Sequence, residues 1–276
     1  MAADIRISSK GMPILERALV VDPVSANVRL LADILRTLSL CRVEGAPSDV
    51  RGLAAARDFD PQIIFVELAA PGVDGLEFTR RLRRSEFSCR EAPVVMITAE
   101  ATAAGIKAAR DAGVHEFLRR PFNMGDLQKR IDAVALRKRD WVEAVAYIGP
   151  DRRRFNSGDY AGPRKRGNDE ATPELQRICQ ALKIVKSAAG AIETDPKQVF
   201  RALKAQADCL GAVALANPAL GPLGEAAAGL QAYLAEALKA GRLSREKVDF
   251  HGAALLEAAP PEARPTDEPR SGEQAA

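Results

Sequence analysis

Four polar side chains in the first half of the chain each end or closely follow a short apolar segment. They are Asp22, Glu67, Thr98 and Arg120. The carboxyl ends of parallel strands meet in one crevice of an open sheet, so we expect these side chains to lie close together. Because a guanidinium is a planar fork that can bond both oxygens of a carboxylate, we also expect Arg120 to pair with Glu67.

The elements that must position these residues alternate between strands and helices. We expect strands at residues 17–22, 41–44, 62–67, 93–98 and 115–118, and helices at 24–38, 48–58, 73–84, 102–112 and 123–139. This alternation predicts an α/β domain at residues 14–140, with a doubly wound, five-stranded parallel sheet of the flavodoxin-like kind. Residues 1–13 are expected to form an N-terminal extension.

The motifs around the four residues resemble those of the receiver domain of bacterial two-component response regulators, of the CheY-like type. The matching segments are Leu19-Val-Val-Asp22, Phe65-Val-Glu67-Leu with Pro71-Gly-Val-Asp-Gly75, Met96-Ile-Thr98-Ala99 and Phe117-Leu-Arg-Arg120-Pro121-Phe122. Their order and spacing make the resemblance specific, and it covers a little under half of the chain.

The resemblance implies a phosphoryl-transfer site. In receivers a carboxylate attacks a partner's phosphohistidine, and Mg²⁺ held by acidic side chains neutralises the phosphoryl charge. A lysine and a Ser/Thr hydroxyl complete the shell, and an aromatic side chain then changes rotamer. Thr98 and the aromatic Phe117 match this pattern, although both residue types are also ordinary in a strand core.

The chain departs from the receiver pattern at three positions. Pro23 stands in place of the second acidic metal ligand. Glu67 replaces the phosphoacceptor aspartate, and Arg120 replaces the lysine. Because attack geometry matters at the level of about 1 Å, the longer side chain of Glu67 should accept phosphoryl groups poorly. Asp22 is then a vestigial ligand, and we expect no metal or other cofactor. The sequence predicts a pseudo-receiver; the alternative left open is residual phosphorelay activity.

Residues 141–171 are rich in Gly, Pro and Arg without periodicity, which predicts a linker or arm. The basic residues of its central part, against two acids, are Arg152, Arg153, Arg154, Arg164, Lys165 and Arg166. Such a composition can neutralise phosphates, so an alternative function is binding of a cyclic dinucleotide or a nucleic acid through this arm.

Residues 172–258 show apolar positions at helical spacing throughout, which predicts an α-helical bundle. Helix starts are indicated by Thr172-Pro173, Asp195-Pro196 and Asn217-Pro218, and a helix end by Gly241. The one histidine of this region, His251, lacks the following lysine of phosphotransfer bundles, so we expect dimerisation or docking instead. Residues 259–276 have almost no apolar anchors and are expected to be disordered.

The composition of the whole chain sets further limits. The net charge is only +3, the four cysteines are scattered, and no apolar run approaches the roughly 20 residues of a membrane span. We find no catalytic constellation and expect no enzyme. The sequence favours a cytoplasmic adaptor, scaffold or dimeric regulator that contacts proteins of a two-component pathway and forms a homodimer through the helical region.

Overall fold

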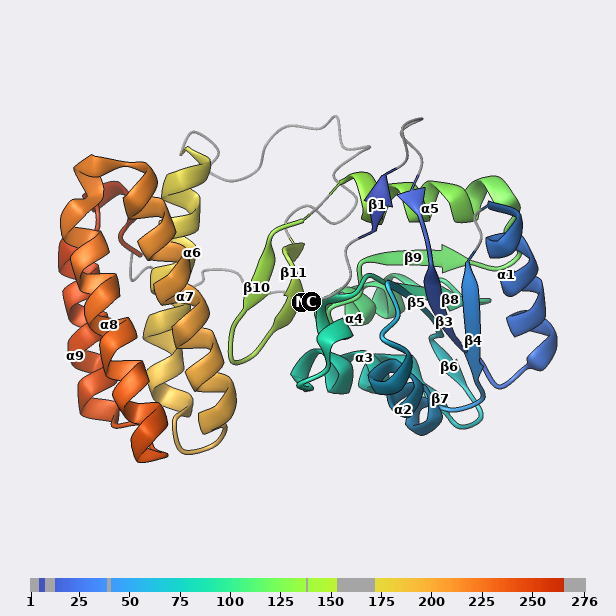
Figure 1. Cartoon of the computed structure of the whole chain (residues 1–276), viewed down its shortest axis with the longest axis horizontal. Helices are drawn as coiled ribbons and strands as arrows, with labels where there is room; N and C mark the ends of the chain where they lie inside the picture. Colours follow the sequence, from blue (N-terminus) through green and yellow to red (C-terminus); the bar gives the residue numbers. More distant parts are fainter. Residues whose placement is uncertain (1–4, 8–12, 39–40, 138, 153–171, 266–276) are drawn as a thin grey trace, which may run out of the picture. The chain divides into compact units, whose positions relative to one another are not determined.

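The computed structural model describes residues 5–7, 13–38, 41–137, 139–152 and 172–265 (Figure 1). The chain divides into two compact units. The first contains Met1–Val142 and Tyr147–Tyr160, and the second contains Glu143–Ala146 and Ala161–Ala276. We call them the sheet domain and the helical domain.

The sheet domain is built on five parallel strands. They are β3 (Arg17–Val21), β4 (Arg42–Ala46), β5 (Ile63–Glu67), β8 (Val94–Thr98) and β9 (Glu116–Arg119), in the order β4-β3-β5-β8-β9. Every residue of β5 and β8 is buried, as expected of central strands covered on both faces. The predicted doubly wound fold is confirmed.

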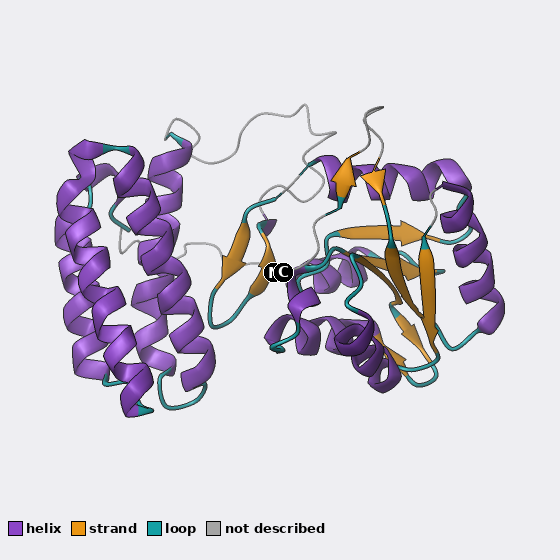
Figure 2. Cartoon of the chain, viewed as in Figure 1, coloured by secondary structure: helices purple, strands orange, loops and turns teal. Residues whose placement is uncertain are grey.

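Helices cover both faces of this sheet (Figure 2). They are α1 (Ser25–Leu38), α2 (Asp49–Phe59), α3 (Gly75–Arg84), α4 (Ala103–Asp111) and α5 (Met124–Leu136). Leu31 of α1 and Ile131 of α5 share one buried cluster, whereas Leu53 of α2, Phe78 of α3 and Ala109 of α4 share the other. Alternate residues of each strand contribute to the two clusters, because successive side chains of a strand point to opposite faces.

Short strands appear where the sequence predicted none. β1 (Arg6–Ile7) pairs with β2 (Pro13–Ile14), so the expected N-terminal extension is in part a strand pair. β6 (Ala69–Ala70) and β7 (Val73–Asp74) pair in the loop after β5. β10 (Trp141–Glu143) and β11 (Ile148–Pro150) form a further two-stranded sheet, so the segment predicted to be an irregular linker from residue 141 begins with regular structure. Strands of two or three residues are too short to show periodicity in a sequence.

The helical domain contains α6 (Pro173–Ala188), α7 (Pro196–Ala216), α8 (Gly221–Ala240) and α9 (Arg245–Ala258) around one apolar cluster. Thr172 and Asp195 cap α6 and α7 as predicted, each before a proline in the first turn. Asn217 instead begins a 3₁₀ turn (Pro218–Leu220) that leads into α8. Among the described residues, no helix is long and apolar enough to cross a membrane.

The expected disorder of the C-terminal tail is wrong for its first residues. A 3₁₀ turn at Pro261–Ala263 follows α9, and Ala259 and Ala263 are buried in the apolar cluster of the helical domain. Small alanine side chains supply this packing, which a search for large apolar anchors overlooks. Residues 266–276 lie outside the described part of the chain.

Candidate functional site

The predicted site residues lie at the carboxyl edge of the sheet. Glu67 ends β5 and Thr98 ends β8, whereas Asp22 directly follows β3. Val21 pairs with Val66 across β3 and β5, so Asp22 and Glu67 occupy adjacent strand ends. The carboxyl ends of parallel strands therefore bring two acidic side chains side by side.

Arg120, which follows β9, joins both carboxylates. Its Nη1 donates a hydrogen bond to Oε2 of Glu67, which is the ion pair that the sequence predicted. Its Nη2 donates to Oδ2 of Asp22 at 2.8 Å, a second bond that sequence reasoning did not foresee. One guanidinium thus bridges two acidic side chains, and we call these three residues the acidic crevice.

The two carboxylates of the acidic crevice are largely shielded from water. The side chain of Asp22 is 3% exposed and that of Glu67 is 9% exposed, whereas that of Arg120 is 25% exposed. Burial raises the pKa of Glu67 above its usual value, and the nearby Arg120 opposes that shift. Loss of solvation disfavours the charged carboxylate and attraction to the guanidinium favours it.

Asp22 has further partners that hold it in place. The backbone N–H of Val24 donates to Oδ1 at 2.8 Å, and Nδ2 of Asn27 donates to Oδ2 at 3.0 Å. Asn27 was missed by sequence reasoning, although it lies in the first turn of α1 directly after the strand end. Pro23, between Asp22 and Val24, brings no side-chain ligand to the crevice.

Thr98, at the same sheet edge, and Phe117, inside β9, make other contacts. The hydroxyl of Thr98 accepts a hydrogen bond from the backbone N–H of Glu100 at 3.1 Å and lies 3.2 Å from its carbonyl oxygen. These bonds keep the hydroxyl within its own loop. Phe117 is half-buried and packs against the apolar cluster under α2, α3 and α4.

The Mg²⁺ ion that the receiver resemblance implies does not fit the acidic crevice. Each oxygen of Asp22 already accepts hydrogen bonds, and the guanidinium of Arg120 stands between the carboxylates. Magnesium requires near-octahedral oxygen ligands, and N–H donors directed at those oxygens repel it. No group of three or more His, Cys, Asp or Glu that could hold a metal occurs within the part of the chain that the structure describes.

Of the predicted anion-binding arm, only Arg152 belongs to the described residues. Its Nη1 donates to Asp111 at 2.9 Å, and its guanidinium lies 4.3 Å from the ring centroid of Tyr147. Both contacts lie within the sheet domain, so the guanidinium of Arg152 already has partners there. The remaining basic residues of the arm, which are Arg153, Arg154, Arg164, Lys165 and Arg166, lie outside the described residues.

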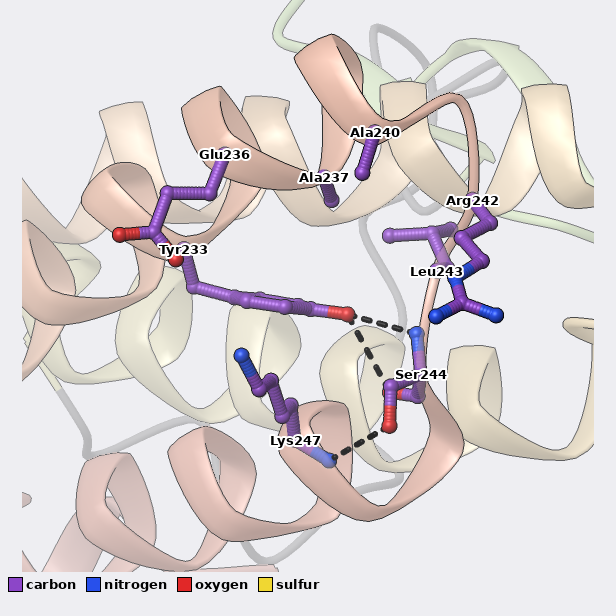
Figure 3. Close-up of a pocket in the computed structure, with 8 residues that line it drawn as sticks. All are labelled: Tyr233, Glu236, Ala237, Ala240, Arg242, Leu243, Ser244 and Lys247. Atoms are coloured by element: carbon purple, nitrogen blue, oxygen red, sulfur yellow. Dashed lines mark hydrogen bonds between the residues drawn. The ribbon is translucent and has the colours of Figure 1, made fainter.

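A cavity of about 520 Å³ lies in the helical domain where α8 turns into α9 (Figure 3). Tyr233 closes one wall, and its hydroxyl accepts a hydrogen bond from the backbone N–H of Ser244 at 2.7 Å. His251 stacks on the same ring with centroids 5.4 Å apart, so the histidine serves packing here. Arg242 and Lys247 also line the cavity, and no predicted site residue does.

A second cavity, of about 810 Å³, lies in the sheet domain at the amino ends of the strands. Gln62, Pro93 and His115, which precede β5, β8 and β9, contribute to its wall. Both acidic and basic residues line this cavity, so the charge of its wall does not indicate a class of ligand. It lies at the opposite sheet edge from the acidic crevice.

Comparison with known proteins places the sheet domain among receivers. A family model of the response regulator receiver domain matches residues 18–132. Chemotaxis protein CheY-3 of Vibrio cholerae serotype O1 is 29% identical over 128 residues, which are 46% of this chain and 95% of that protein. The KDP operon transcriptional regulatory protein KdpE of Escherichia coli (strain K12) is 37% identical over 120 residues, which are 44% of this chain and 51% of that protein.

Solved structures that resemble the chain also cover less than half of it. Chemotaxis response regulator CheY4 of Vibrio cholerae is 23% identical with a TM-score of 0.41, covering 44% of this chain and 98% of that one. A CheY-like receiver domain protein from Methanospirillum hungatei JF-1 is 23% identical with a TM-score of 0.39, covering 43% and 91%. The family model ends at residue 132, and the helical domain has no family assignment.

Proposed function

We propose that this chain, whose residues 18–132 form a response regulator receiver domain, is a signalling protein that acts through protein contacts and without phosphorylation. The observation that supports this most is the position of Glu67. It stands at the end of β5, its side chain is 9% exposed, and it is bonded to Arg120. A buried and paired glutamate is a poor nucleophile for phosphoryl transfer, because neither its reach nor its environment suits attack.

The neighbouring residues support the same proposal. Thr98 bonds within its own loop and Asp22 is held by three donors, so neither is free to bind a phosphoryl group. The site therefore holds one arrangement of charges by itself. Such a receiver signals by presenting a constant surface to its partners.

We further propose how the whole chain is used. Protein partners in a two-component pathway would contact the receiver, and the helical domain would join two copies of the chain or dock a partner, in the cytoplasm. We propose no enzymatic activity. Anion binding through residues 151–166 is not favoured, because Arg152 is already paired with Asp111.

The test is incubation of the purified chain with a small-molecule phosphodonor and Mg²⁺, followed by intact mass measurement. We expect no increase of about 80 Da, the mass of one phosphoryl group. A matched control carries Pro23→Asp, Glu67→Asp and Arg120→Lys, which restores the receiver pattern, and this variant should gain that mass. Phosphorylation of the unmodified chain would refute the proposal.

A further inference from the structure

We propose that Arg120 is a built-in cation that takes the place of a divalent metal ion in the acidic crevice. This inference deepens the proposed function and rests on it. The guanidinium of Arg120 would explain why this receiver domain needs neither a metal ion nor a phosphoryl group.

The charges of the crevice require a cation. Asp22 and Glu67 stand at the ends of adjacent strands, where two carboxylates shielded from water repel each other. Arg120 follows β9, which is separated from β5 by β8, and its guanidinium gives one nitrogen to each carboxylate. Bridging neighbouring acidic side chains is the role that a bound divalent cation performs elsewhere.

The hydrogen bonds at the carboxylate oxygens disfavour a metal ion between Asp22 and Glu67. Oδ1 of Asp22 accepts from Val24, and Oδ2 accepts from both Asn27 and Arg120. Oε2 of Glu67 accepts from Arg120. A metal ion that bridged the two carboxylates would have to take the position of the guanidinium, because Arg120 contacts one oxygen of each.

This arrangement differs from an exposed ion pair. The carboxylates are 3% and 9% exposed, so removing Arg120 leaves two buried charges without compensation. The guanidinium is also part of the chain, so no chelator removes it. A lysine at the same position is a point charge, which can approach one carboxylate but cannot bridge two.

The experiment is calorimetric titration of the full chain with Mn²⁺, which prefers the same oxygen ligands as Mg²⁺. The unmodified chain should show no saturable binding with a Kd of about 1 mM or tighter. Arg120→Lys and Arg120→Met should each bind Mn²⁺ at least about tenfold more tightly than the unmodified chain. Adding Asp22→Asn to Arg120→Lys should cancel that gain.

The neighbouring Arg119, which is exposed, offers a matched control. Arg119→Ala removes the same charge from the adjacent residue and should behave as the unmodified chain. The proposal is overturned if the unmodified chain binds Mn²⁺ in the millimolar range. It is equally overturned if folded Arg120→Lys binds no better than the unmodified chain.

Variants that fold poorly still give an answer through thermal unfolding. Millimolar Mn²⁺ should raise the Tm of either Arg120 variant and leave that of the unmodified chain unchanged, and the absence of such a rise overturns the proposal. The result of the Mn²⁺ experiments can be distinguished from a failure of the proposed function. Phosphorylation of the unmodified chain would reject the proposed function, whereas the Mn²⁺ titration tests Arg120 alone.

Discussion

Single residues show how the receiver domain accommodates buried charge far from the acidic crevice. Arg83 is 1% exposed, and its guanidinium donates to the carbonyl oxygens of Gly113 and Ala92, both at 2.9 Å. Burial lowers the pKa of Arg83 to about 10, so it remains charged at neutral pH. Carbonyl oxygens rather than a carboxylate therefore stabilise this cation, and His115 lies against it at 3.2 Å.

The stability of the receiver domain should depend on pH through His115. Nδ1 accepts hydrogen bonds from the backbone N–H of Val94 and from Arg83, so the neutral ring carries its proton on Nε2. Burial, with the positive charges of Arg83 and Arg139, holds the pKa of His115 well below its usual value. Below a pH of about 6.5 the unfolded chain binds a proton that the folded chain does not, which stabilises the unfolded state.

Chemical denaturation across this range measures the effect. The free energy of unfolding should decrease by up to about 1.4 kcal/mol for each pH unit below about 6.5. His115→Asn retains a hydrogen-bond acceptor but has no titrating ring, so its stability should fall less steeply over the same interval. Equal pH slopes for the two proteins would contradict the assignment.

Of the two bonds that Arg120 makes in the acidic crevice, the sequence predicted only one. The Glu67–Arg120 pair was predictable, because strand ends of one parallel sheet converge and the two side chains have complementary charge. The bond from Arg120 to Asp22 was not, since nothing in the sequence fixes which carboxylate the second nitrogen faces. The backbone carbonyl groups that bind a buried arginine such as Arg83 likewise cannot be identified from the sequence.

At the scale of elements, the β10–β11 sheet rests on the receiver domain through a close approach of two glycines. Gly113 follows α4 with φ of +94°, and Gly149 lies in β11 with φ of +154°. A Cβ atom on Gly113 would lie 2.5 Å from the carbonyl oxygen of Ile148. Trp141 of β10 lies in the same contact, with its ring 5.2 Å from the guanidinium carbon of Arg83.

Gly113→Ala should therefore displace this strand pair. The left-handed backbone and the clash together should lower the free energy of unfolding by roughly 1–3 kcal/mol. The chain has a single tryptophan, so the fluorescence of Trp141 should also change as its contact with Arg83 loosens. Gly190→Ala is the control, because a Cβ there meets nothing within 4 Å. Unchanged fluorescence in Gly113→Ala would show that the sheet is not held by this contact.

Long periodic elements were predictable from the sequence and short ones were not. The five strands and five helices of the receiver domain lie within a few residues of their expected positions, because buried strands and amphipathic helices have strong patterns. The β10–β11 sheet is different, because it contacts Gly113, which is distant in sequence. Its docking is a tertiary effect that no local pattern encodes.

At the scale of the whole molecule, the helical domain combines a buried core with apolar side chains left in solvent. Leu215, Leu238 and Phe250 are 88%, 67% and 70% exposed. Glu143–Ala146 also belong to this domain, and Gln198 donates to the carboxylate of the buried Glu143 at 2.8 Å. Covering these side chains with another protein surface, such as a second copy of the chain, would remove their apolar area from water.

The last prediction is that the chain forms a homodimer through the helical domain. Light scattering should give the mass of a dimer for residues 1–276 and of a monomer for a chain that ends at residue 169. Leu215→Ser with Phe250→Ser should weaken the dimer, because both changes remove exposed apolar surface without touching the core. Val50→Ser is the matched control, since Val50 is 62% exposed on α2 of the receiver domain and should leave the dimer intact. A dimer that survives removal of residues 170–276 would place self-association in the receiver domain, and a monomeric full chain would leave the helical domain as a docking surface for a different protein.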